Sequence, residues 1–165
     1  NAKNQVKNRL RFQSFDDSFV PQEQYAYLMD AAESHPSVSN YAMGVAAMAA
    51  LDDGKLLVLE REFVVTSSKI GSFVENKIYC VDPVKSMTIS QEKALDTDSP
   101  YMQKTLVATW KTSLGLLRQN LANYEGMCLG PRLADGSQVI VLCADSQDQY
   151  GGVLRDWFRT IIIRS

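Results

Sequence analysis

The sequence has few of the residues on which several common activities depend. It contains one histidine, His35, and three cysteines among 165 residues. Cys80, Cys128 and Cys143 each lie in an apolar run and share no spacing typical of a metal site, so buried free thiols are expected. No apolar run approaches the ~20 residues needed to cross a bilayer. The sequence therefore predicts neither a cysteine-based metal site nor a membrane span.

Charge of one sign is not in excess either. The chain carries 17 Lys+Arg and 19 Asp+Glu, and its basic residues form no patch. This balance argues against a nucleic-acid partner, which would need a basic surface. The length predicts a single domain. The chain begins at Asn1 with no Met and no signal-like segment, as expected of a mature product or a piece of a longer protein.

One strand, turn and strand pattern occurs twice along the chain. Aligned without a gap, the first copy matches the second at four positions, namely Gly44, Leu51, Asp53 and Gly54 against Gly126, Leu133, Asp135 and Gly136. Each Asp-Gly pair predicts a hairpin turn, because glycine accepts a positive φ at little cost. Repeated β-units form arrays in which each unit buries its faces against its neighbours.

The remaining pattern predicts about ten strands and one short helix. The alanine-rich segment 45–51 favours a helix by propensity, but the matching copy holds Gly130-Pro131, so a strand is expected there. A loop is expected over residues 30–40. Segment 56–63 is apolar on both faces, which predicts a strand covered by other sheets on both sides. The helix is expected over 112–121, where Leu114, Leu117 and Leu121 fall on one face.

In chain order the strands group as two, then four, then three. Four antiparallel strands make one blade of a β-propeller. We therefore predict an all-β chain, a propeller fragment of about two and a half four-stranded blades. Residues 1–30 form a partial blade, 41–110 a full blade, 111–122 a helical connector and 123–165 the last blade. A ring needs roughly four to eight blades, so the expected partner is a missing N-terminal half; the alternative is a small β-domain complete in itself.

Two phrases of the sequence resemble a known family. The segment Tyr124-Glu-Gly-Met-Cys-Leu-Gly-Pro-Arg-Leu-Ala-Asp-Gly136 and the phrase Leu56-Leu-Val-Leu-Glu-Arg61 are similar to the recurrent motifs of the phytase-like family, named for esterase-like activity of phytase. The resemblance implies a β-propeller in secreted or periplasmic bacterial proteins. It also implies a hydrolase acting on phosphate or carboxylic esters. The chain departs from the family by lacking its N-terminal blades.

The residues themselves point away from a serine esterase. The sequence holds no Gly-x-Ser-x-Gly elbow, and His35 lies in a polar loop with no serine placed beside it. Carboxylates are better candidates. Glu125 opens an innermost strand, near the axial channel of a propeller, and Asp145 and Asp148 follow a later strand. Glu125, Asp145 and Asp148 could together hold Ca²⁺, which prefers oxygen ligands. Glu125 could equally pin a loop through backbone N–H groups.

Four residues make up the candidate ligand-binding site. We expect it to comprise Glu125, Arg61, Glu60 and Tyr124. Arg61 could grip an anion with its forked donors, or it could point between blades and pair with Glu125 for structural reasons. Glu60 could contribute to the channel mouth, although charges at strand ends, Glu62 included, are usually solvated.

Several other residues attract a simpler interpretation. Arg132 adjoins a turn and is expected to be exposed. Asp96-Thr97-Asp98 lacks the spacing of a calcium loop, so exposed loop acids are expected. The aromatic residues are expected to pack between blades, with a ligand-channel lining as the alternative; they are Tyr41, Tyr124, Trp110 and Trp157.

Two functions follow from this pattern. The first is a phytase-like hydrolase that binds a small anionic or ester ligand at the axial channel; no catalytic residue is assigned. The second is a non-catalytic propeller that binds a protein or glycan partner.

Overall fold

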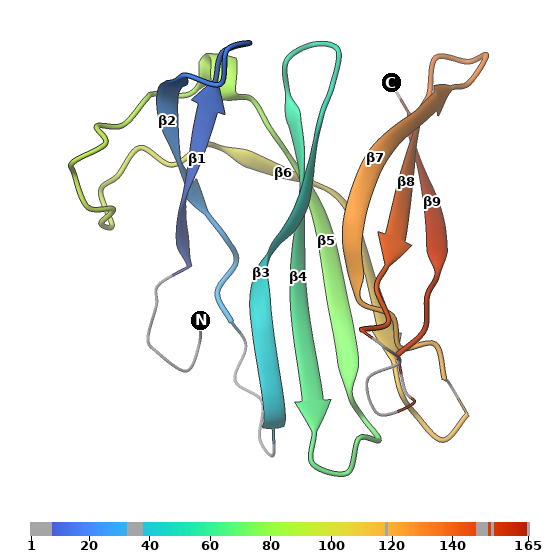
Figure 1. Cartoon of the computed structure of the whole chain (residues 1–165). Coiled ribbons are helices and arrows are strands. Elements are labelled where there is room, and N and C mark those ends of the chain that lie inside the picture. Colours follow the sequence, from blue (N-terminus) through green and yellow to red (C-terminus); the bar gives the residue numbers. More distant parts are fainter. Residues whose placement is uncertain (1–7, 33–37, 118, 148–151, 153, 165) are drawn as a thin grey trace.

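The computed structural model describes residues 8–32, 38–117, 119–147, 152 and 154–164. These residues form nine strands in three antiparallel sheets, and they include the 3₁₀ turn Pro83–Lys85. Figure 1 shows the sheets side by side, with the four-stranded sheet between the other two. The prediction of an all-β chain is thus confirmed. No helix in the described part of the chain is long and apolar enough to span a membrane.

Strand order follows the sequence within every sheet. The first sheet contains β1 (Arg9–Phe15) and β2 (Pro21–Leu28). The middle sheet contains β3 (Val38–Ala50), β4 (Leu56–Thr66), β5 (Phe73–Val81) and β6 (Lys104–Ser113). The third sheet contains β7 (Tyr124–Arg132), β8 (Gln138–Ala144) and β9 (Phe158–Ile163). The predicted grouping into two, four and three strands is confirmed.

The two Asp-Gly turns have the same geometry. Gly54 and Gly136 adopt φ values of 83° and 85°. In the first turn the Leu51 amide donates to the Lys55 carbonyl at 2.8 Å. In the second turn the Leu133 amide donates to the Ser137 carbonyl at 2.9 Å. The first strands of the two hairpins, β3 and β7, lie in contact, and Arg132 Nη2 donates to Asp52 Oδ2 at 2.8 Å across the turns. The repeat seen in the sequence is therefore a structural repeat.

The middle sheet is covered on both faces, as its apolar strands predict. Side chains alternate along β4, so Leu57 and Leu59 face the third sheet, where they join a core with Ile140. Val58 faces the first sheet and packs with Tyr27. These two cores fix the middle sheet against its neighbours.

The helix expected over 112–121 is absent from the described part of that segment. β6 instead continues to Ser113, and Leu117 is 99% exposed. The Thr112 hydroxyl donates to the Ala122 carbonyl at 2.9 Å and accepts its amide at 3.1 Å, which closes the connection as a loop. The leucine spacing was misleading because Leu117 is exposed to solvent, whereas Leu114 and Leu121 pack into one core from an extended connection.

Several strand limits also differ from expectation. β3 begins at Val38, inside the segment expected to be a loop, and β4 continues past Phe63 to Thr66. Glu60 and Glu62 consequently lie within β4 and not at its end. Their expected solvation is wrong: both residues are buried, with exposures of 2% and 6%.

The connection from β5 to β6, residues 82–103, crosses to the first sheet. Thr88 bridges Tyr25 and Tyr101 bridges Ala26, so the connection lies along the free edge of β2. The Met102 amide donates to the Ala26 carbonyl at 2.9 Å. Figure 1 shows this yellow-green segment beside β2. The first and middle sheets are therefore joined by backbone pairing as well as by side-chain packing.

The three cysteines are free, as predicted, but two of them are not buried. Cys128 and Cys143 are exposed, and Cys80 is half-buried. Cys128 pairs with Val141 and Cys143 with Gly126, on the face of the third sheet turned away from the middle sheet. Their apolar sequence surroundings reflect strand composition and not burial within this chain.

Candidate ligand-binding site

Two polar clusters lie on opposite faces of β4. Glu60, Arg61 and Glu62 are consecutive, and alternation along the strand sends Arg61 to one face and the two glutamates to the other. The Arg61 cluster lies between the middle and third sheets. The Glu60 cluster lies between the middle and first sheets.

Arg61 reaches across to the start of β7. Its Nη1 lies 3.2 Å from Glu125 Oε1 and donates a hydrogen bond to Asn123 Oδ1. Asn123 Nδ2 donates in turn to Glu125 Oε1 at 2.7 Å. The side chains of Arg61 and Glu125 keep 16% and 33% of their surface exposed, whereas Asn123 is fully buried. The predicted pairing of Arg61 with Glu125 is thus present, and a buried amide holds both partners.

Burial lowers the pKa of the Arg61 guanidinium, and the adjacent Glu125 carboxylate acts in the opposite direction. Arginine is so basic that it stays protonated at neutral pH. The cluster therefore presents a fixed positive charge beside one carboxylate. Gly44 is the cross-strand neighbour of Arg61 on β3, and a Cβ added there would meet no atom within 4 Å. Space is thus open at Gly44, next to Arg61 on the adjoining strand.

A row of polar side chains extends from Arg61 across the middle sheet, with half-buried residues on either side of a fully buried asparagine. Arg61 pairs in register with Asn76 on β5, which pairs with Trp110 on β6. Three buried atoms of this row have no hydrogen-bond partner among the described residues: Arg61 Nε, Asn76 Oδ1 and Trp110 Nε1. A buried polar atom left without a partner costs about 1–3 kcal/mol.

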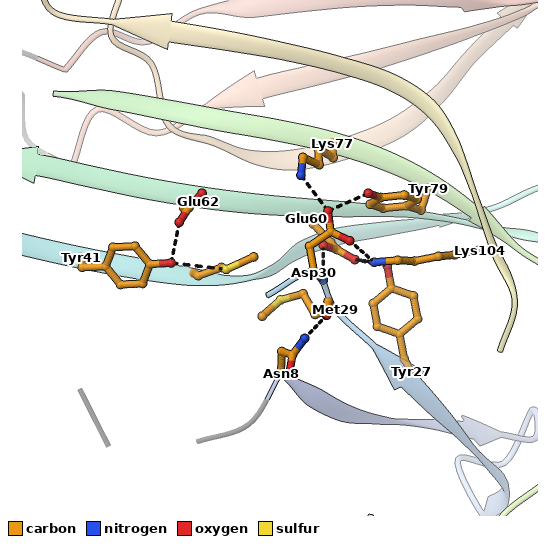
Figure 2. A network of polar contacts seen from close by, with 11 residues as sticks. Asn8, Tyr27, Met29, Asp30, Tyr41, Glu60, Glu62, Lys77, Tyr79 and Lys104 are labelled. Atoms are coloured by element: carbon orange, nitrogen blue, oxygen red, sulfur yellow. Dashed lines mark hydrogen bonds and ion pairs between the residues drawn. The ribbon is translucent and has the colours of Figure 1, made fainter. Parts of the chain in front are cut away.

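The Glu60 cluster joins the first sheet to the middle sheet (Figure 2). Glu60 Oε1 accepts hydrogen bonds from the Tyr27 hydroxyl at 2.5 Å and from Lys104 Nζ at 2.7 Å. Glu60 Oε2 accepts the Asp30 amide at 2.9 Å. Both oxygens of this buried carboxylate are therefore satisfied from within the protein.

Asp30 lies at the centre of the same cluster. Its carboxylate receives Lys104 Nζ at 2.6 Å, Lys77 Nζ at 2.7 Å and the Tyr79 hydroxyl at 2.8 Å. Lys104 Nζ also lies 4.0 Å from the centre of the Tyr79 ring. Two lysines, Lys77 and Lys104, thus neutralise the carboxylates of Asp30 and Glu60. Lys104 contacts both carboxylates and so joins them in one cluster. We interpret this cluster as a link between sheets, since a ligand would have to break it to bind.

The electrostatics of the cluster follow from these contacts. Burial by itself would raise the pKa of the Asp30 carboxyl, but hydrogen bonds from Lys104, Lys77 and Tyr79 outweigh burial and lower the pKa to about 2. Burial and the bond to Asp30 raise the pKa of Tyr79, and burial with the bond to Glu60 raises that of Tyr27. Both phenols therefore stay protonated as donors.

The Asp30 carboxyl makes stability depend on acidity. Its pKa falls from 3.8 to about 2 on folding, so the unfolded chain binds more protons between those values. The resulting stabilisation, about 2 kcal/mol, is fully present above pH 4 and is lost as the pH falls toward 2. Urea unfolding between pH 5 and 2 measures this slope, and Asp30→Asn should flatten it. Equal slopes in the parent and in Asp30→Asn would contradict the assignment; Asp17→Asn, at an exposed turn, serves as the control.

A known protein family matches most of the chain. The family described as phytase-like, with esterase-like activity of phytase, matches residues 1–147 of the 165-residue chain. The chain belongs to the phytase-like family. No curated protein and no solved structure matches it. The family signature from Tyr124 to Gly136 forms β7 and its hairpin turn, so the segment that carries the resemblance also carries Glu125.

The other expected residues of this phytase-like chain lie as follows. Tyr124 is buried and packs edge-on against Trp110, with ring centres 5.5 Å apart, which fits the packing interpretation. Arg132 is exposed, as predicted. Glu62 accepts the Tyr41 hydroxyl at 2.7 Å on the same face as Glu60. Of the expected ligand-binding set, the structure brings Arg61 and Glu125 together and places Glu60 on the opposite face of β4.

The calcium hypothesis stays a prediction. Within the described residues no group of three or more His, Cys, Asp or Glu is placed to hold a metal ion. Glu125 is already paired with Arg61, and Asp145 Oδ1 accepts the Gln147 amide at 2.7 Å. Asp148 and His35 lie outside the described residues. The loop acid Asp96 bonds within its own turn, to the amide of Asp98 at 3.1 Å.

Sequence reasoning missed most of the Glu60 cluster. It did not single out five residues, namely Asp30, Lys77, Lys104, Tyr27 and Tyr79. One signal was available, because a glutamate inside an apolar strand must find a cation or donors when it is buried. That signal does not say which of 17 basic residues in the chain supplies the charge.

Proposed function

We propose that this chain is part of an esterase-like β-propeller that binds a small anionic or ester ligand beside Arg61 and Glu125. Family membership supports the esterase-like activity at the level of the family. Equivalent hairpins in neighbouring sheets, with β3 and β7 in contact, support an arrangement around an axis. In that arrangement the first strand of each sheet lines the channel.

The observation that carries the proposal is the position of Arg61 and Glu125 where the middle and third sheets meet. The guanidinium is held by Asn123 on one side and keeps part of its surface open. Gly44 leaves space on the adjoining strand. An arginine in this setting can donate forked hydrogen bonds to a phosphate or carboxylate oxygen.

The residues take different roles in this proposal. Arg61 binds the negative charge of the ligand, and Glu125 fixes the guanidinium or exchanges a proton with the ligand or an attacking water. Asn123 positions both, and Tyr124 packs behind them. Glu60 is left out, because its contacts are satisfied by Tyr27, Lys104 and Asp30.

We further propose that additional blades complete the ring. The first sheet has two strands and the third has three, against four in the middle sheet. Apolar side chains lie exposed on β9, where Phe158 and Ile162 have exposures of 81% and 55%. Further strands on these sheets would cover the open edges and the apolar face. The partner in this proposal is the N-terminal half of the same propeller.

An ester-cleavage assay tests the proposed function. The 165-residue chain, alone and within any longer product of its gene, would be assayed with p-nitrophenyl phosphate and p-nitrophenyl acetate. Glu125→Gln should lower kcat/KM by about 10²-fold or more if Glu125 moves a proton, and Arg61→Lys should raise KM. Arg132→Lys, at the exposed turn, is the matched control. A Glu125→Gln variant as active as the parent would refute the site, and absence of turnover in every form would favour the binding alternative.

A further inference from the structure

We propose that the interface between the middle and third sheets contains a binding site for one water molecule, formed by Arg61, Asn76 and Trp110. The inference does not depend on the proposed function. It rests on the three buried atoms of the row that lack partners among the described residues, Arg61 Nε, Asn76 Oδ1 and Trp110 Nε1. Buried polar atoms in proteins are almost always bonded to protein or to ordered water.

The register places the three side chains in one row on the same face of the middle sheet. Arg61, Asn76 and Trp110 are direct cross-strand neighbours on β4, β5 and β6. Such neighbours on one face have Cβ atoms about 4.5–5.5 Å apart. Asn76 is fully buried and lies between the other two. We infer that a water molecule bound above Asn76 lies between the side chains of Arg61 and Trp110.

The donors and acceptors of the row match water. Arg61 Nε and Trp110 Nε1 are N–H donors, and Asn76 Oδ1 is an acceptor. Water can accept two hydrogen bonds and donate a third, which satisfies the whole row. An anion would be repelled by Asn76 Oδ1, whose orientation follows from donation by Nδ2 to the Val74 carbonyl at 3.5 Å. The three side chains therefore favour the binding of water over that of a halide ion.

The water has a consequence for Arg61. The guanidinium is held at Nη1 by Asn123 and Glu125. A water at Nε would hold it from the other side and fix its plane. Asn76 and Trp110 thereby act as positioning residues for Arg61, although neither contacts Glu125 through any hydrogen bond or ion pair in the described part of the chain.

The two tryptophans provide a test with an internal control. Trp110 Nε1 is buried, whereas Trp157 is an exposed residue. In ¹⁵N-labelled protein, NOE and ROE spectra between water and the two indole N–H groups should differ. Trp110 is expected to show a cross-peak with the sign of a long-lived water, and Trp157 that of fast hydration water. Trp110→Phe assigns the two resonances.

The variants decide between the outcomes. Asn76→Leu removes the acceptor at similar volume and should abolish the long-lived cross-peak at Trp110 while the indole resonance remains. A long-lived peak that survives in Asn76→Leu overturns the proposal, as does its absence from the parent protein. If Asn76→Leu does not fold, water-oxygen relaxation dispersion on the parent and on Trp110→Phe should show the loss of one long-lived water. A shift of the Trp110 indole on addition of bromide would indicate an anion site and would also overturn the proposal.

Discussion

Replacement of Lys104 by methionine is expected to lower the free energy of unfolding by about 3–5 kcal/mol, the usual effect of breaking a buried ion pair on one side. Lys104 contacts both carboxylates of the cluster, Asp30 Oδ1 at 2.6 Å and Glu60 Oε1 at 2.7 Å. Glu60 is almost completely buried, and the variant would remove the ammonium group that contacts its carboxylate. Methionine retains the length of the side chain, so the effect reports on charge and not on a cavity.

Lys111→Met provides the matched control, because Lys111 lies on the same strand and is exposed, with its Nζ 3.9 Å from the centre of the Phe73 ring. Its effect should stay within about 1 kcal/mol. Adding Glu60→Gln to Lys104→Met should recover part of the loss, since the uncompensated charge is then removed. Urea unfolding of the parent, Lys104→Met, Glu60→Gln and the double variant gives the coupling energy between the two side chains. Equal losses in Lys104→Met and Lys111→Met would show that the cluster does not stabilise the fold.

Truncation of Leu59 to alanine is expected to lower the free energy of unfolding by about 2–5 kcal/mol. Leu59 is fully buried and belongs to the core shared with Ile140 and Leu142 of the third sheet. The lost methyl groups would leave a cavity between two sheets whose backbones are fixed by their own hydrogen bonds. Sheets of this kind cannot close such a cavity without breaking register.

Leu106→Ala on β6 is the control for Leu59→Ala, because Leu106 is half exposed; its effect should lie within about 0.5 kcal/mol. Hydrogen exchange adds a regional readout. Leu59→Ala should speed exchange in β7 and β8 more than in β1 and β2, which pack on the opposite face of β4. Uniform acceleration in all three sheets would contradict the assignment of Leu59 to the interface with the third sheet.

The strand repeats could be predicted because they are encoded locally. Asp-Gly at the turn and apolar residues on either side specify a hairpin without any distant partner, and both turns have the expected positive φ at glycine. The continuous apolar character of β4 likewise predicted cover on both faces, which Leu59 and Val58 now show. A closed propeller needs more blades than the three sheets described here, so closure remains a proposal.

The helix over 112–121 could not be judged from spacing alone. Leucines three and four residues apart predict a helix only when a surface exists to receive them. Here Leu121 enters a core with Leu154, while Leu117 is solvent-exposed. A side-chain bond from Thr112 to the Ala122 backbone, ten residues away, decides the conformation, and no local pattern reveals it.

The candidate site was predictable in one of its two halves. Arg61 lies in line with the inward leucines of β4, which correctly predicted its direction and its pairing with Glu125. The Glu60 cluster depends on Asp30, Lys77 and Lys104, which come from three other segments. Their convergence is set by the register of β4 with β5 and by the docking of the first sheet, and both are tertiary properties.

The path of the β5–β6 connection sets an order of maturation during synthesis on the ribosome. Thr88 and Tyr101 pair with β2, but they follow it in the chain by more than the whole of β3, β4 and β5. A nascent chain that has emerged only to Val81 holds β2 with one edge unpaired, a geometry that recruits other chains. Protection of that edge begins when Thr88 leaves the exit tunnel and is complete only after Met102 follows. Slow elongation while the segment from Thr88 to Met102 is leaving the tunnel would therefore prolong the interval in which this edge of β2 is unprotected.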